Sequence, residues 1–225
     1  MHNFIKISLA AVCALLLSAC GNSVKINTID NSYSSDTMTA NIKIPQIKGL
    51  SSRDLETSIN DEFSSVTKEL LKKWEPQASE TGEQSLFDMN TVTHFNKNGL
   101  LSLVTDYEYF ARKAHKNSFR IAKNIDASAC RELSLSDLFD GDGYIDALNS
   151  MLRDAVSAAP EKYADIWAKP KILQNQGFYT DGENLVLFYP PYELSYYERG
   201  FVEIPVPLDE LLTYMKPEYR EIFAR

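Results

Sequence analysis

The sequence has little cysteine and little histidine, and each shortage excludes a class of site. Of its three cysteines, Cys13 and Cys20 fall near the N-terminus and Cys130 stands alone, so no disulfide is expected within the mature chain. The three histidines, His2, His94 and His115, show no metal-ligand spacing. We therefore expect no metal and no cofactor. No Ser-His-Asp order, nucleophile elbow or phosphate loop is found.

Basic charge is also scarce. The chain has 23 Lys and Arg against 31 Asp and Glu, a net charge of −8. This balance excludes a nucleic-acid partner, which needs a clustered basic face, and is compatible with a cationic partner. After residue 20, no hydrophobic stretch approaches membrane-spanning length.

The N-terminus has the features of a bacterial lipoprotein leader. Lys6 precedes an apolar run from Ile7 to Leu17, which has the length of a signal peptide core. Small residues then lead to Cys20 in Leu17-Ser18-Ala19-Cys20-Gly21, a sequence that resembles a lipobox. We expect cleavage before Cys20 and lipidation of its thiol, so that acyl chains anchor the protein to a membrane. Because Gly21 rather than Asp follows Cys20, this membrane is expected to be the outer one in a double-membrane bacterium, and otherwise the cell membrane.

The first half of the mature chain contains a tether, a strand and a helix. Residues 1–19 are the signal peptide, and 20–37, rich in Ser and Asn, are predicted to be the lipidated cysteine and a flexible tether. Alternating apolar residues predict a strand over Thr39–Ile47, which Pro45 confines to an edge or an end. A helix follows, capped by Ser51 or Ser52 and closed by Trp74 and Pro76. Its inward positions are Leu55, Ile59, Phe63, Val66 and Leu70.

The remainder is rich in predicted strands. A strand over Phe87–Phe95, the turn Asn96–Gly99 and a return strand over Leu100–Phe110 form a hairpin. A third strand follows. The later elements are a helix, two strands and a closing helix that begins at Asp209–Tyr214. Irregular alternation of these elements predicts an α+β fold with an antiparallel sheet. The third strand is predicted over Phe119–Ile125. The later helix is predicted over Tyr144–Val156, with Ile145, Leu148, Leu152 and Val156 facing inward. The two later strands are predicted over Leu185–Tyr189 and Phe201–Val206.

Three features are candidates for chemistry. Cys130 follows a strand and has no nearby His signature, which favours a structural thiol. Asp140–Gly143 looks like the start of a calcium loop, but the following residues do not suit one, so we interpret it as a loop and helix cap. The segment from Pro190 to Arg199, here called the tyrosine loop, contains Tyr192, Tyr196 and Tyr197. Its stiff prolines and its tyrosines suit a recognition surface, although tyrosines packed inward would give the same pattern.

Four motifs follow one another along the chain. They are Tyr107-x-Tyr109, Ala114-His115-x-Asn117, Leu133-x-Leu135-x-Asp137-Leu138-Phe139, and Phe178-Tyr179 with Leu185-Val186, Tyr189-x-Pro191-Tyr192-Glu193-Leu194 and Gly200-Phe201 after it. In this order they resemble the extracellular C-terminal domain of RsiV-type anti-sigma factors, a family that also forms the non-catalytic N-terminal part of PdaC-type peptidoglycan deacetylases. The resemblance implies a PdaC-like α/β subdomain over 38–112 and an RsiV-like domain over 113–225. It also implies binding of a lysozyme-like muramidase or a cell-wall glycan.

The sequence departs from the family at one loop. Lys113-Ala114-His115-Lys116 stands where the family has Gly-Ala-His-Gly, so the loop shape and its ligand are expected to differ. We expect neither an anti-sigma segment nor a deacetylase module beside the domain, and therefore a binding module rather than an enzyme. The alternative is an envelope hydrolase that uses His115 with a carboxylate such as Glu193. The candidate ligand-binding residues are His115, Asn117, Tyr192, Glu193, Tyr196 and Tyr197.

Overall fold

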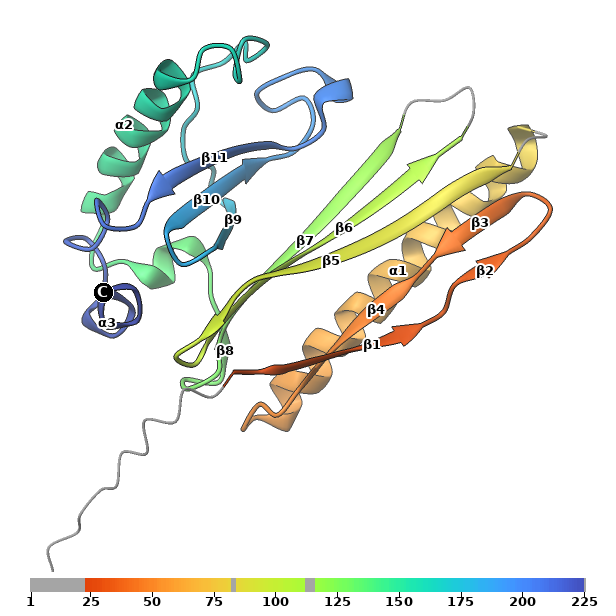
Figure 1. Ribbon diagram of the computed structural model, residues 1–225, viewed down its shortest axis with the longest axis horizontal. Coiled ribbons are helices and arrows are strands. Elements are labelled where there is room, and N and C mark those ends of the chain that lie inside the picture. Colours follow the sequence, from red (N-terminus) through yellow and green to blue (C-terminus); the bar gives the residue numbers. More distant parts are fainter. Residues whose placement is uncertain (1–22, 82–83, 112–115, 225) are drawn as a thin grey trace, which may run out of the picture.

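The computed structural model describes residues 23–81, 84–111 and 116–224, and it has an α+β fold, as predicted (Figure 1). The predicted signal peptide, Cys20 and His115 lie outside these residues. No helix in the described part is both long and apolar enough to cross a membrane. The elements are β1 Lys25–Asp30, β2 Tyr33–Ser34, β3 Met38–Asn41, β4 Lys43–Lys48, α1 Arg53–Thr81, β5 Ser85–Lys97, β6 Leu100–Phe110, β7 Asn117–Asp126, β8 Arg131–Glu132, η1 Leu135–Leu138, α2 Gly143–Ala158, β9 Gly177–Thr180, β10 Asn184–Tyr189, η2 Tyr197–Arg199, β11 Val202–Pro207 and α3 Pro217–Phe223.

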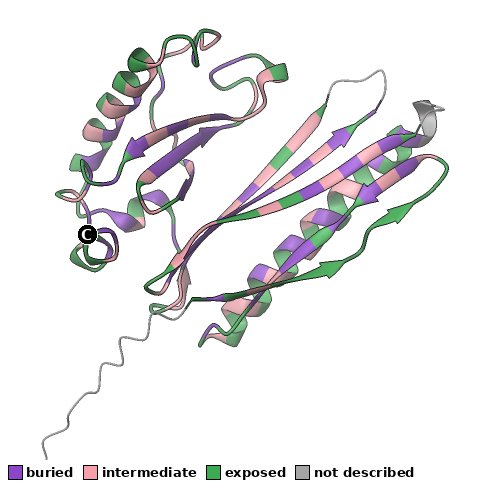
Figure 2. Ribbon diagram, viewed as in Figure 1, coloured by how far each residue is buried: buried purple, intermediate pink, exposed green. Residues whose placement is uncertain are grey.

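A six-stranded sheet in the order β2-β3-β5-β6-β7-β8 forms the first layer. All its neighbours are antiparallel except β3 and β5, which run parallel. Helix α1 covers one face, and its predicted inward positions pack into the core there. Figure 2 shows this buried seam along α1 and the strands. From β6, Leu101, Leu103, Tyr107 and Tyr109 are fully buried in the same core.

The hairpin between β5 and β6 forms at the predicted turn. Asn98 and Gly99 both have positive φ, 53° and 79°, as a two-residue type I′ turn requires. A Cβ on Gly99 would come within 2.4 Å of Ser128 Oγ, so the close approach of the next turn adds a second need for glycine.

A second, three-stranded antiparallel sheet, β11-β10-β9, lies against the other face of the first sheet. Helix α2 covers its outer side, where Leu148 and Leu152 are fully buried. Between the sheets, Val104 of β6 packs with Tyr179, Val186 and Phe188. Both faces of the central strands are therefore covered.

Several predicted elements differ from the structure. The predicted tether is wrong over Lys25–Ser34, because β1 pairs with β4, and β2 with β3. One strand was predicted over Thr39–Ile47, and two are found. The predicted division between residues 112 and 113 falls between β6 and β7, which pair along their whole length. Strand β9 was not predicted.

The predicted end of α1 and the predicted start of the closing helix are wrong, and in α2 one predicted inward side chain is wrong. Helix α1 continues through Pro76 to Thr81. Buried Trp74 and Ala78 lie on either side of the proline, and Trp74 stacks on Tyr109 at 5.4 Å, so packing outweighs the lost hydrogen bond. In α2, Ile145 is 37% exposed and Tyr144 takes the inward place. Residues 209–214 form turns, and the closing helix is α3.

Candidate functional site

The tyrosine loop connects β10 to β11 and presents two of its tyrosines to solvent. Tyr192 is 67% exposed and Tyr196 60% exposed, whereas Tyr189, the last residue of β10, is fully buried. Core and surface therefore meet where β10 passes into the loop. Tyr192 has a φ of 71°, a left-handed conformation that is unusual for a residue with a Cβ.

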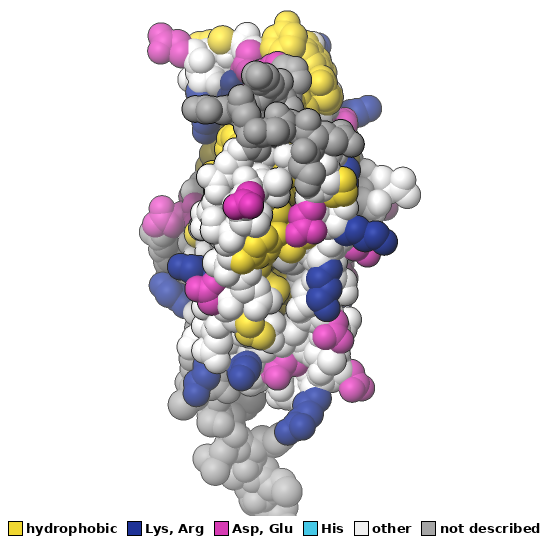
Figure 3. Space-filling view, turned by 90° about the vertical axis from the view of Figure 1, so that its right-hand side faces the viewer, with side chains coloured by type: hydrophobic (Ala, Val, Ile, Leu, Met, Phe, Trp, Pro, Cys, Tyr) yellow, Lys and Arg dark blue, Asp and Glu magenta, His cyan; other side chains and the backbone are white. Residues whose placement is uncertain are grey.

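Trp167 extends this aromatic surface, and sequence reasoning missed it. Its indole is 50% exposed and lies edge-on to Tyr196, with ring centroids 4.8 Å apart. The Trp167 backbone N–H donates to the carbonyl of Leu194 at 3.0 Å, which joins the two segments. Figure 3 shows hydrophobic side chains at the upper end of the molecule, where Figure 1 places the segment that follows α2 and the connection between β10 and β11. A tryptophan between the charged residues Asp165 and Lys169 was the available signal.

A polar anchor beneath the aromatic residues holds the loop in place. The Ser195 hydroxyl donates to Asp165 Oδ2 at 2.7 Å, and Ser195 itself is buried. Arg199 forms an ion pair with Asp165 and donates to the carbonyl of Lys162 at 2.6 Å. The Ser195 hydrogen bond, helped by the Arg199 charge, holds the pKa of the Asp165 carboxyl below its ordinary value of 3.8. The loop is thus ordered before any ligand binds, which reduces the entropy cost of binding.

The structure brings most of the predicted site residues together. Tyr197 lies with its ring 5.2 Å from that of Tyr192, and its hydroxyl donates to Asn117 Oδ1 at 3.3 Å. Glu193 is exposed, and its N–H donates to the carbonyl of Pro190. His115 lies outside the described residues, so its predicted pairing with Glu193 stays a prediction.

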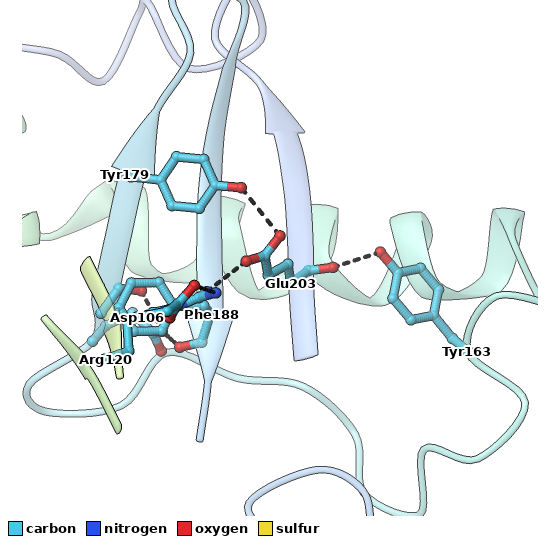
Figure 4. A network of polar contacts seen from close by, with 8 residues as sticks. Asp106, Arg120, Tyr163, Tyr179, Phe188 and Glu203 are labelled. Atoms are coloured by element: carbon cyan, nitrogen blue, oxygen red, sulfur yellow. Dashed lines mark hydrogen bonds and ion pairs between the residues drawn. The ribbon is translucent and has the colours of Figure 1, made fainter. Parts of the chain in front are cut away.

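A polar network between the two sheets is the second notable cluster, and it was also missed (Figure 4). Arg120 of β7 donates to both carboxylate oxygens of Asp106, at 2.6 and 2.9 Å, and forms an ion pair with Glu203 of β11. Its guanidinium lies over the rings of Phe188 and Phe201, 5.1 and 4.5 Å from their centroids.

Tyr179 and Tyr163 complete this network at Glu203. The Tyr179 hydroxyl donates to Glu203 Oε2 at 3.1 Å, and the Tyr163 hydroxyl donates to the Glu203 carbonyl at 2.9 Å. Burial and the nearby Glu203 charge raise the pKa of Tyr179. His94 stacks on Tyr179 at 4.0 Å, and burial lowers the pKa of its imidazole below 6.5. Because each charge has a partner, the network is suited to joining the sheets.

The remaining candidates show no sign of chemistry. Within residues 23–81, 84–111 and 116–224, no three His, Cys, Asp or Glu side chains are placed to hold a metal ion. Cys130 is half-buried in a turn, where its thiol contacts the carbonyl of Ala127 at 3.6 Å. Asp142 occupies the N-cap position of α2, but its side chain makes no capping hydrogen bond.

Comparison with known proteins shows what these features are similar to. Residues 136–209, which contain Trp167 and the whole tyrosine loop, match the model of the DUF3298 family, described as a protein of unknown function. The chain is also 28% identical over 195 residues to anti-sigma-V factor RsiV of Bacillus subtilis, which covers 81% of this chain and 67% of RsiV. The chain carries an RsiV-like domain. RsiV is by name an anti-sigma factor.

Two solved structures share the fold of this RsiV-like protein. A DUF3298 family member from Bacteroides fragilis superposes with a TM-score of 0.68 at 18% identity, covering 90% of this chain and 98% of its own. A second, from Pseudomonas aeruginosa, gives a TM-score of 0.57 at 15% identity, covering 87% and 93%. Because these high coverages include both sheets, the two-layer arrangement is common to all three proteins.

Proposed function

We propose that the protein is a lipid-anchored envelope protein whose folded part is a non-catalytic binding module for a lysozyme-like muramidase. The similarity to RsiV carries this proposal. The tyrosine loop supports it, because the matched region contains exposed aromatic side chains on an ordered loop. The hydrolase alternative needs His115, which lies outside the described residues, and no other observation favours it.

The composition of the loop surface suits a protein partner. Tyr192, Tyr196 and Trp167 offer large rigid areas with hydrogen-bonding atoms, the residue types that most often dominate binding energy at interfaces. Exposed Glu193 and Glu198 border them, and the whole chain carries a net charge of −8. A basic partner would therefore be attracted over long range and would meet acidic side chains around an aromatic centre.

Variants of the loop test this surface. Tyr196→Ala, which also leaves Trp167 without its ring contact, is expected to weaken lysozyme binding by about 2 kcal/mol, roughly 30-fold. Ile29→Ala is the matched control, because Ile29 is 48% exposed on β1, in another part of the fold. Urea unfolding of both variants shows whether the fold is retained. Equal affinities of the two variants would remove the loop from the binding surface.

The anchor requires a separate test. Cys20→Ala is expected to abolish incorporation of a fatty-acid analogue and to leave an uncleaved or mislocalised precursor in the producing bacterium. Equal labelling of the wild type and the variant would contradict lipidation at Cys20. A titration with peptidoglycan fragments, run beside lysozyme, distinguishes a glycan ligand from a protein ligand.

A further inference from the structure

Strand β7 has a free edge over most of its length. Its ten residues pair with β6 on one side, but β8 covers only Ile125 and Asp126 on the other. The Leu133 N–H donates to the Asn124 carbonyl on that outer side. The backbone N–H and C=O groups of successive residues in a strand point to opposite edges. Those of Ala122, Arg120 and Ser118 therefore point to the same outer side as the Asn124 carbonyl. Among the described residues, none supplies a backbone partner to these three on that side.

The outer edge of β9 in the second sheet is covered, unlike that of β7. Strand β9 is also an edge strand, but side chains of the first sheet form hydrogen bonds with its outward backbone groups. Asn124 Nδ2 donates to the Phe178 carbonyl at 2.9 Å, and the Thr180 N–H donates to Ser102 Oγ at 3.0 Å. Folded proteins usually block exposed strand edges in such ways, since free edges recruit other chains. The uncovered edge of β7 is therefore a candidate for pairing with another chain.

A cavity of about 580 Å³ lies beside this open edge. Ser118, Arg120 and Ala122 line it, and so does Leu133, which marks the outer side of β7. Its volume is within the range of sites that hold a ligand side chain or a small molecule. The rest of the lining combines aromatic, aliphatic and polar side chains, and it includes the exposed amides of Gln174 and Asn175. The walls include Tyr144, Phe178, Phe188, Pro190, Pro191 and Phe201.

The charges near the cavity favour one kind of occupant. Arg120 is the charged residue in the lining. Its two ion-pair partners, Asp106 and Glu203, lie outside the lining, and the three side chains together carry a net charge of about −1. Both carboxylates keep partial contact with water, with 29% and 37% of their side chains exposed. A ligand with a basic flank is therefore preferred over an acidic one.

We propose that β7 and this cavity bind an extended peptide segment of a partner protein. The segment adds as a strand to the outer edge of β7, because an extended backbone supplies donors and acceptors at the two-residue repeat that Ser118, Arg120 and Ala122 present. One apolar side chain enters the cavity, and a basic residue lies toward Asp106 and Glu203. The site adjoins the tyrosine loop, because Pro190 and Pro191 line the cavity, but the exposed rings of Tyr192, Tyr196 and Trp167 are not part of its lining. The proposal therefore does not depend on a lysozyme-like partner.

The test begins with a random peptide library selected on the purified full chain in detergent. A selected peptide is then synthesised with single N-methyl groups placed in turn along its backbone, and each form is titrated by calorimetry. Strand addition predicts about tenfold weaker binding at every second position, where a hydrogen bond to β7 is lost, and little change between. Uniform or irregular losses, or a library that yields no binding peptide, would overturn the proposal.

Variants of the chain supply the matching evidence. Ala122→Pro removes an outward N–H, while leaving the bonds to β6 in place, and is expected to weaken the peptide by about tenfold or more. Ala122→Ser keeps that N–H and is the matched control. Equal binding of the two folded variants would contradict strand addition. If Ala122→Pro does not fold, the methylated peptides still decide the question, since they leave the protein unchanged.

Discussion

Replacing Arg120 with methionine tests the account of how the two sheets are joined. The change removes two hydrogen bonds to Asp106, the ion pair with Glu203 and the contacts with Phe188 and Phe201. Methionine retains most of the volume but leaves the carboxylates of Asp106 and Glu203 without their shared cation.

The structure sets the expected size of this effect. Breaking a fully buried ion pair costs about 3–5 kcal/mol, whereas an exposed pair contributes about 1 kcal/mol or less. The Arg120 side chain is only 10% exposed, but Asp106 and Glu203 are 29% and 37% exposed, so water partly solvates the carboxylates left behind. We expect a loss of about 2–3 kcal/mol in the free energy of unfolding, between these limits.

Urea unfolding followed by circular dichroism measures this loss. Adding Asp106→Asn and Glu203→Gln to Arg120→Met should recover part of it, because the repulsion disappears. Arg120→Lys should be intermediate, since an ammonium cannot bond both oxygens of Asp106 in the same way. A loss below about 0.5 kcal/mol for Arg120→Met would refute the reasoning, as that is the usual effect of a surface substitution.

Further predictions concern titration and local conformation. Burial lowers the pKa of His94 below 6.5, so its stabilising contribution is complete above that pH and is lost as the pH falls toward the folded pKa; unfolding of His94→Gln should show a shallower pH dependence there. The pKa of Asp165 is also lowered, so its contribution is present above 3.8 and lost as the pH falls below it; Trp167 fluorescence should stay constant from pH 7 to about pH 5 and change only near pH 4 and below. A change near neutral pH that Asp165→Asn does not alter would contradict the role of Asp165. Cys130→Gly should leave stability unchanged or raise it by up to about 1 kcal/mol, because Cys130 has a φ of 52°; a loss above 1 kcal/mol in urea unfolding would show that the thiol packs more tightly than its exposure indicates.

The sequence predicted elements whose signal is local. The hairpin of β5 and β6 was predicted because Asn98 and Gly99 favour a type I′ turn between alternating apolar residues. The start of α1 was predicted because Ser52 can cap it, and the Ser52 hydroxyl accepts from the Leu55 N–H at 3.3 Å. Strand β1 gave no such signal, since five of its six residues are exposed and its pairing with β4 alone defines it.

The candidate site was predictable only in part, for a related reason. The density of tyrosines identified the loop, but the choice between surface and core depended on packing, which places Tyr189 inside and Tyr196 outside. Trp167 and Arg120 were missed because their partners are distant in sequence. Arg120 meets Glu203 83 residues away, and no residue pattern reports such a contact.

Isothermal titration of the purified protein with hen-type lysozyme tests the central claim most directly. A lysozyme-binding module predicts a saturable complex whose affinity falls as salt rises from about 0.05 M to about 0.5 M, because salt screens the attraction between an acidic chain and a basic partner. It also predicts a loss of affinity for Tyr196→Ala and none for Ile29→Ala. The absence of heat and of any complex at about 100 μM protein, a Kd too weak to matter, would contradict lysozyme as the ligand.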